Sequence, residues 1–207
     1  MDSSSVAGAT VFKARTSRWF TGLAVLVTAG GLASVVATDG PAGLLTAWPL
    51  LGIAYGGWWL FWYPAVLVAE DAVTLRNPLV TVRVPWNALI DVDTRYALKL
   101  VTPSRGYTAW AAPAPGVWGT HSGKVEHLTN LPSTSYGPGG SVRPGDLKNT
   151  DSGHAAYLVR SRWQELVETG RLDVDRPEKA QRRCNMAPLA AGVLLVVATA
   201  LTFGVIS

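Results

Sequence analysis

The chain has 207 residues, of which 48% are hydrophobic and 15% are charged, and its mean hydropathy is +0.20. This composition is too apolar for an ordinary soluble domain, so membrane spans are the first feature to look for. The net charge of +4 is modest, and residues 64–186, with 15 basic and 12 acidic side chains, carry +3. Nucleic-acid binding is therefore not expected, because it needs a clustered basic stripe.

Three uncharged stretches are long enough to cross a bilayer, namely residues 19–38, 44–63 and 187–206. A helix of this length reaches ~30 Å at ~1.5 Å per residue, which is the thickness of the hydrocarbon core. The sequence therefore predicts a membrane protein with a two-span hairpin over residues 19–63, a third transmembrane helix over 187–206, and a tail over residues 1–18.

The basic residues predict the orientation of these spans. Cations precede the first and third spans, whereas the loop 39–43 has none; the cations are Lys13, Arg15, Arg18, Lys179, Arg182 and Arg183. By the positive-inside rule, the N-terminus and residues 64–186 are cytoplasmic and the C-terminus lies outside a bacterial plasma membrane. A rival interpretation is a secretory signal cleaved after Ala37. A retained anchor is favoured because the apolar run is long and a second span follows almost at once.

The second stretch ends in "WWLFWYP", residues 58–64, which holds five aromatic side chains. Nearly consecutive rings at the end of a span that point all round one helix are typical of an aromatic belt at headgroup level, and Pro64 allows the helix to stop. A ligand box would need rings from several elements. The same stretch carries Gly52 and Gly56, a small-xxx-small pair that predicts close helix packing, against this chain's own helices or against a partner.

Residues 64–111 alternate between apolar and polar side chains, as in Val80, Val82 and Val84, and predict a meander of about five short antiparallel strands. Residues 112–150 are rich in Pro, Gly, Ser and Thr and are predicted to be a flexible insertion. Residues 151–170 have helical spacing and predict an amphipathic helix that packs on the sheet, with Arg160 facing water. Residues 171–186 are expected to be a basic juxtamembrane linker.

The stretch "RNPLVTVRVPWNALIDVDTRYALKLVT", residues 76–102, resembles the bacterial pleckstrin-homology-like (PH-like) domain of the low-molecular-weight protein antigen 6 type, found mainly in actinobacterial membrane proteins. The resemblance covers roughly residues 66–111. It implies an α+β fold in which a curved antiparallel sheet is closed by a C-terminal helix. It also implies structural roles for Trp86 as a core anchor and Pro78 as a turn former, and Trp163 of the following helix is expected to anchor that helix on the sheet. The family implies a binding or scaffolding module near a membrane and supplies no established ligand.

No catalytic or metal-binding pattern is present, so we expect neither an enzyme nor a cofactor. The three histidines and Cys184 lack metal-ligand spacing, and "GTHSGKV" has Trp118 and Val125 where a phosphate loop needs Gly and Ser or Thr. Asp91 and Asp93 have no evident acid or base partner. Cys184 stands alone, which fits a cytoplasmic domain, and a lone thiol beside a span is more often inert than acylated.

Four basic side chains are candidates for binding a lipid headgroup or a partner: Arg76, Arg83, Arg95 and Lys99. The alternation places Arg83 opposite the apolar face, so these four could equally be the solvated face of a half-buried sheet. The sequence thus predicts a membrane-anchored PH-like module that assembles with another membrane protein. The alternative is a sensor of anionic lipid headgroups.

Overall fold

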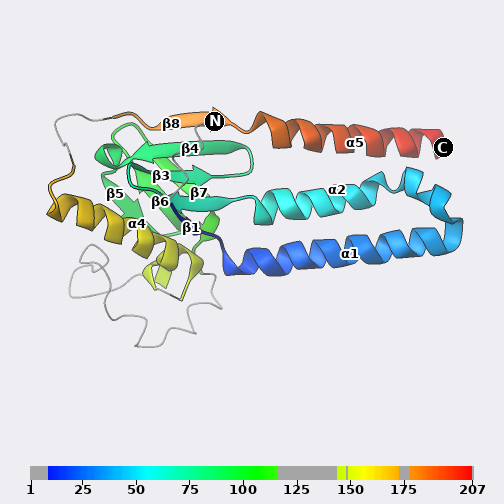
Figure 1. Cartoon of the computed structure of the whole chain (residues 1–207), viewed down its shortest axis with the longest axis horizontal. Coiled ribbons are helices and arrows are strands. Elements are labelled where there is room, and N and C mark those ends of the chain that lie inside the picture. The colour runs from blue at the N-terminus through cyan, green and yellow to red at the C-terminus, as the bar shows by residue number, and fades with distance from the viewer. Residues whose placement is uncertain (1–8, 116–143, 148, 173–177, 207) are drawn as a thin grey trace.

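A β-rich domain and three long helices make up the computed structural model, which describes residues 9–115, 144–147, 149–172 and 178–206. Figure 1 shows the helices leaving one end of the domain and running side by side. These helices are α1 (Arg15–Asp39), α2 (Trp48–Gly57) and α5 (Met186–Ile206), and each is connected to a strand of the domain at the same end.

The first sheet has five antiparallel strands in the order β1-β2-β3-β4-β8. They are β1 (Thr10–Phe12), β2 (Ala65–Val68), β3 (Ala72–Arg76), β4 (Val80–Pro85) and β8 (Gln181–Cys184). Alternation buries Val66, Val73 and Val84 on one face, and register pairs Val66 with Leu75 and Val73 with Val84. The buried face therefore matches the apolar alternation in the sequence.

A second sheet of three antiparallel strands packs against the first. It consists of β5 (Asp91–Asp93), β6 (Ala97–Val101) and β7 (Gly106–Pro113). A 3-10 turn, Trp86–Ala88, connects the sheets, and its Trp86 side chain is 3% exposed with its indole nitrogen 3.1 Å from the carbonyl oxygen of Ala69. Antiparallel strands were expected here, and the strands after this turn form a second sheet where a single curved sheet was expected.

Two strands lie where the sequence predicted a tail and a linker. β1 lies within residues 1–18 and pairs with β2, and β8 lies within residues 171–186 and pairs with β4. Both are edge strands of three or four residues, too short to show a period of their own. Their pairing is fixed by contacts between distant segments.

The helix α4 (Asp151–Glu168) covers the inner face of the sheets, with Ala155, Ala156 and Val159 fully buried. Its N-cap is Thr150, whose hydroxyl accepts a hydrogen bond from the backbone N–H of Gly153 at 3.0 Å. Trp163 is partly buried against the core. The C-terminal helix of the expected α+β fold is therefore present.

Arg160 does not face water as expected, since it is 4% exposed. Its guanidinium donates to the carboxylate of Asp146 at 2.5 Å and to the carbonyl oxygen of Val92 at 2.5 Å. Asp146 also accepts from the hydroxyl of Thr94 at 2.8 Å. The end of the predicted flexible insertion is thus packed against α4 and β5, while residues 116–143 of that insertion lie outside the described residues.

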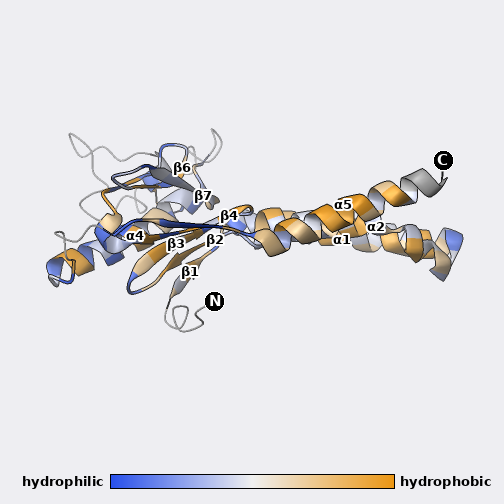
Figure 2. Ribbon diagram, turned by 90° about the horizontal axis from the view of Figure 1, so that it is seen from above, coloured by the Kyte–Doolittle hydropathy of each residue, from blue (hydrophilic) through white to orange (hydrophobic). Residues whose placement is uncertain are grey.

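The three helices that extend away from the domain are α1 (Arg15–Asp39), α2 (Trp48–Gly57) and α5 (Met186–Ile206). Only one helix of the described chain, Arg15–Asp39, is long and apolar enough to cross a membrane, and its apolar window is 6% buried. The predicted second span is divided into a 3-10 helix at Pro41–Thr46, α2, and a π turn at Trp58–Trp62. Pro41 and Pro49 set these starts, because proline suits the first turn of a helix. Figure 2 shows the hydrophobic residues concentrated along all three helices.

The three helices pack through glycines that the sequence pattern did not single out. A Cβ atom added to Gly57 would lie 2.4 Å from Cβ of Ala24 on α1, and one added to Gly31 would lie 2.7 Å from Leu50. In contrast, added Cβ atoms at Gly52 and Gly56 would meet nothing within 4 Å. The expectation that Gly52 and Gly56 pack against this chain's own helices is therefore wrong, because α2 is rotated so that Gly57 faces α1.

Candidate binding surface where the helices meet the domain

The three helices leave the β domain through very short connections, and we call this region the junction. Two residues separate β1 from α1, two separate the π turn from β2, and Asn185 alone separates β8 from α5. Asp151, the first residue of α4, accepts hydrogen bonds from the backbone N–H of Arg15 at 3.0 Å and from the hydroxyl of Thr16 at 3.3 Å. The start of α1 is thereby fixed to the start of α4.

Asn77, in the turn between β3 and β4, connects three parts of the junction. Its side-chain amide donates to the carbonyl oxygen of Thr108 at 2.9 Å, and its side-chain oxygen accepts from the backbone N–H of Trp110 at 2.8 Å. Its own carbonyl oxygen accepts from the amide of Asn185 at 2.7 Å. One residue thus ties the first sheet to β7 and to the segment that enters α5.

The aromatic residues at the end of α2 contact the domain as well as pointing outward. The indole nitrogen of Trp59 donates to the carbonyl oxygen of Pro78 at 3.0 Å, so Pro78 forms the turn and also holds the helix end. The indole of Trp110 donates to the carbonyl oxygen of Leu60 at 2.7 Å. Trp58 and Trp62 remain 39% and 40% exposed. The aromatic stretch therefore joins helix to sheet and leaves part of its ring surface free.

The four predicted basic candidates do not converge on one site. The Arg76 side chain donates to the carbonyl oxygen of Tyr63 at 2.8 Å, and Arg83 is paired with the carboxylate of Asp71. Arg95 lies in the turn after β5, and Lys99 lies on β6, in the second sheet. Two of the candidates are thus engaged within the first sheet, and the other two belong to a different sheet.

Other cations gather at the junction, and the sequence had suggested them only as markers of orientation. They are Lys13, Arg15 and Arg18 around the start of α1 and Arg182 and Arg183 on β8. The Lys13 ammonium lies 4.3 Å from the centre of the Trp62 ring. Burial lowers the pKa of Lys13 below its ordinary value of 10.5, and the nearby Arg76 guanidinium lowers it further. The two groups follow opposite edges of the first sheet, since β1 and β8 are its first and last strands.

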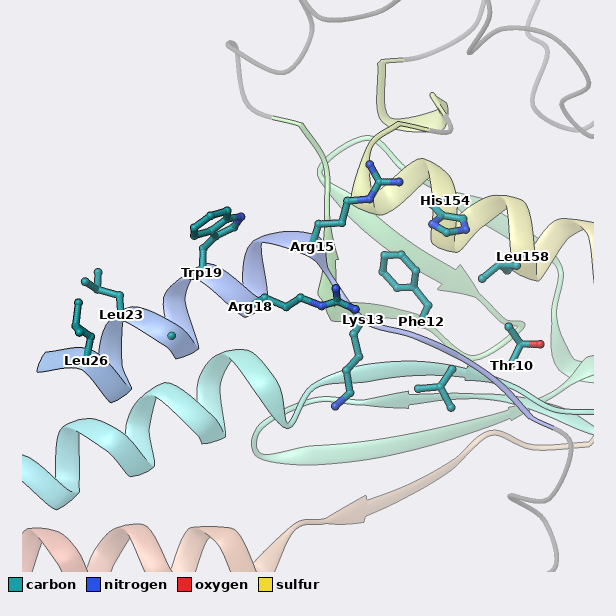
Figure 3. Close-up of a pocket in the computed structure, with 12 residues that line it drawn as sticks. Thr10, Phe12, Lys13, Arg15, Arg18, Trp19, Leu23, Leu26, His154 and Leu158 are labelled. Carbon is teal, nitrogen blue, oxygen red and sulfur yellow. The ribbon is translucent and has the colours of Figure 1, made fainter. Parts of the chain in front are cut away.

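Two open grooves lie at the junction. The first, the α1 groove, has a volume of about 1140 Å³ and is formed by β1, the start of α1 and α4. Figure 3 shows Arg15 and Arg18 at the start of α1, with Trp19, Leu23 and Leu26 further along the helix. Phe12 and His154 form the wall on the domain side, with ring centroids 5.3 Å apart at 82°.

The second, the β7 groove, has a volume of about 880 Å³ and lies between β7, the turn of β3 and β4, and the end of α2. Its apolar lining includes Leu79 and Trp110, which are 55% and 56% exposed, and Arg105 and Arg182 are among its basic residues. Both grooves are of a size that accommodates small ligands or a partner's side chains.

No group of His, Cys, Asp and Glu that could hold a metal ion occurs among the described residues. His121 and His127 lie outside them. Asp91 and Asp93 accept hydrogen bonds from the backbone N–H groups of Val92 and Arg95, at 2.8 and 3.1 Å. These two carboxylates therefore shape the turns around β5.

Comparison with known proteins identifies the domain type. Residues 63–122 match the family model described as "Bacterial PH domain". The match begins at the end of the π turn and covers β2 to β7. This part of the chain is a PH-like domain built of antiparallel sheets. No curated protein and no solved structure matches the chain.

Proposed function

We propose that this chain is a three-span membrane protein whose PH-like domain binds and helps assemble another membrane protein, without catalysing a reaction. The observation that carries this proposal is the junction, where hydrogen bonds from Asn77, Trp59 and Trp110 fix the domain to its helices. A domain held this way stays at the membrane surface in one orientation, and its effective concentration toward membrane partners is high.

The lengths of the three helical segments support three spans. At ~1.5 Å per residue, α1 measures ~38 Å and α5 ~31 Å. α2 and the π turn together reach ~22 Å, and the 3-10 segment before them turns the chain back from the end of α1 (Figure 1). α1 and α5 match the ~30 Å hydrocarbon core, and the middle segment reaches most of the way across it. The exposed apolar side chains of α1, such as Leu23 and Leu26, would be unusual in water.

The position of β1 supports a retained anchor over a cleaved signal. Removal of residues 1–37 would remove β1 with them, and Phe12 of β1 is 5% exposed in the core of the domain. A signal peptide leaves the mature protein and contributes nothing to its core. The cations at the domain end of the helices support a cytoplasmic domain, with the C-terminus outside.

Two surfaces support a protein partner. The β7 groove presents exposed apolar side chains beside the helices. A Cβ atom added at Gly52 or Gly56 would meet nothing within 4 Å, so another helix has room to approach α2 there. A membrane protein that packs on α2 and reaches the domain would contact both surfaces.

The test is purification of the full chain from its native membrane in mild detergent, followed by mass spectrometry of stoichiometric partners. We expect Gly52→Ile combined with Gly56→Ile to lose the partner. Gly30→Ile is the matched control, because an added Cβ at Gly30 also meets nothing within 4 Å. Equal partner recovery from both variants would contradict the α2 docking face, and the absence of any partner would contradict the assembly function.

The alternative function is recognition of anionic lipid headgroups. The geometry does not favour the residues first considered for it, since Arg76, Arg83, Arg95 and Lys99 are dispersed. What favours a lipid function is the separate cluster of cations at the start of α1.

A further inference from the structure

We propose that the α1 groove binds one anionic phospholipid from the leaflet on the domain side, with its phosphate on Arg15 and Arg18 and an acyl chain along α1. This inference rests on the membrane placement of α1 in the proposed function. It assigns a ligand and a site that are distinct from the partner surfaces on α2 and at the β7 groove.

The headgroup end of the groove is built from cations without a counter-ion. Arg15 and Arg18 are exposed, and in the described part of the chain neither side chain has an ion pair or a hydrogen bond. Lys13 adds a third positive charge to the lining. The carboxylate of Asp151 on α4 accepts from the backbone N–H of Arg15 and the hydroxyl of Thr16, and in the described part of the chain it makes no ion pair with the Arg15 or Arg18 guanidinium. An anionic phosphate is therefore the complementary group for this end.

The same groove continues as an apolar stripe on one face of α1. Residues 15, 18, 19, 22, 23 and 26 follow helical spacing, so the cations and Trp19, Leu23 and Leu26 share that face. Trp19 is 82%, Leu23 56% and Leu26 70% exposed. Gly22 lies between them, and its missing side chain leaves space, since an added Cβ would meet nothing within 4 Å.

The dimensions match one leaflet. From Arg15 to Leu26 the helix rises ~16 Å, which is about half of the ~30 Å hydrocarbon core. The site begins with cations at the membrane surface and continues into one leaflet. It fits a phospholipid better than a phosphorylated peptide, because the N–H and C=O groups of an extended peptide would have no hydrogen-bond partners in the hydrocarbon region. A soluble phosphate would use only the first part of the groove.

The test uses the full chain in nanodiscs of phosphatidylcholine with a minor fraction of phosphatidylglycerol, followed by native mass spectrometry of retained lipid. We expect one phosphatidylglycerol per chain. Arg15→Gln combined with Arg18→Gln should weaken its retention about thirty-fold, since each cation near an anionic lipid contributes a factor of about five. The matched control, Arg95→Gln combined with Lys99→Gln, removes the same charge from the second sheet and should leave retention unchanged.

A second variant tests the apolar part without changing charge. Gly22→Leu fills the stripe and should cause loss of the retained lipid, while Gly30→Leu, on the same helix but outside the groove, should not. Displacement of the lipid by an equal concentration of soluble glycerol phosphate would show that the acyl chain contributes nothing, and would overturn the proposal. Retention of phosphatidylcholine equal to that of phosphatidylglycerol would overturn it too, as would an equal loss of lipid from the Arg15/Arg18 double variant and the Arg95/Lys99 control.

Membrane insertion is measured in parallel by resistance to alkaline carbonate extraction. A chain that stays in the membrane but retains no phosphatidylglycerol would overturn the lipid site and leave the proposed function intact. A chain that carbonate extracts would overturn the membrane placement, and the lipid site with it.

Discussion

Replacing Phe12 by Ala tests whether the segment before α1 is part of the folded domain. Phe12 is 5% exposed and meets the His154 ring edge-on at 5.3 Å. A buried Phe→Ala change costs about 3–5 kcal/mol, and we expect ~3 kcal/mol because an edge strand can partly collapse into the space. For a domain of this size that lowers the midpoint of thermal unfolding by roughly 12–24 °C.

The assay is thermal unfolding of the full chain in detergent, followed by tryptophan fluorescence and near-UV circular dichroism. Val11→Ala is the matched control, because Val11 is on the same strand with its side chain 49% exposed. It should change the free energy of unfolding by less than ~0.5 kcal/mol. If the two variants had equal midpoints, β1 would not belong to the core, and the argument for a retained anchor would fail.

Three further changes probe the fold and the junction. Asp146→Asn removes the negative charge that the buried Arg160 guanidinium contacts and should cost about 3–5 kcal/mol in thermal unfolding, whereas a loss below ~1 kcal/mol would contradict the buried pair. Gly57→Ala should destabilise the helix bundle by about 1–3 kcal/mol through its clash with α1, while Gly52→Ala should be neutral or slightly stabilising in the same assay. Because the pKa of folded Lys13 lies below 10.5, the unfolded chain binds more protons just below that pH, so wild type should gain stability relative to Lys13→Gln as pH rises toward 10.5. Arg76→Gln should reduce that gain, and an unchanged gain would show that Arg76 does not act on Lys13.

Local patterns in the sequence predicted the elements that have a long enough period. The alternation from Val80 to Val84 lies on β4, and the helical spacing after residue 151 lies on α4. β1 and β8 were not predicted, because strands of three and four residues are too short to show a period. β8 reads Gln-Arg-Arg-Cys and is exposed along its whole length, so nothing in it marks a strand until β4 lies beside it.

The candidate site was less predictable because it depends on rotation and on distant pairing. Gly52 and Gly56 have the spacing of a packing motif, but the direction in which α2 faces decides which glycine touches α1, and that glycine is Gly57. Arg160 lies on the buried face of α4, and its partner Asp146 comes from a Pro- and Gly-rich stretch whose composition indicated a loop. Neither the contact of Gly57 with α1 nor the pairing of Arg160 with Asp146 can be recognised from the spacing of residues in the sequence.

The strand order has a consequence for how the protein is made. Both edges of the first sheet come from segments that directly precede helices: β1 emerges from the ribosome before α1, and β8 emerges last, just before α5. In the three-span arrangement, β1 must wait for two helices to insert before β2 exists to pair with it. The sheet then closes only when all its strands are on the same side of the membrane. In that arrangement, a chain with one inverted helix would leave β1 or β8 on the other side of the membrane, and the edge of β2 or β4 would stay unpaired.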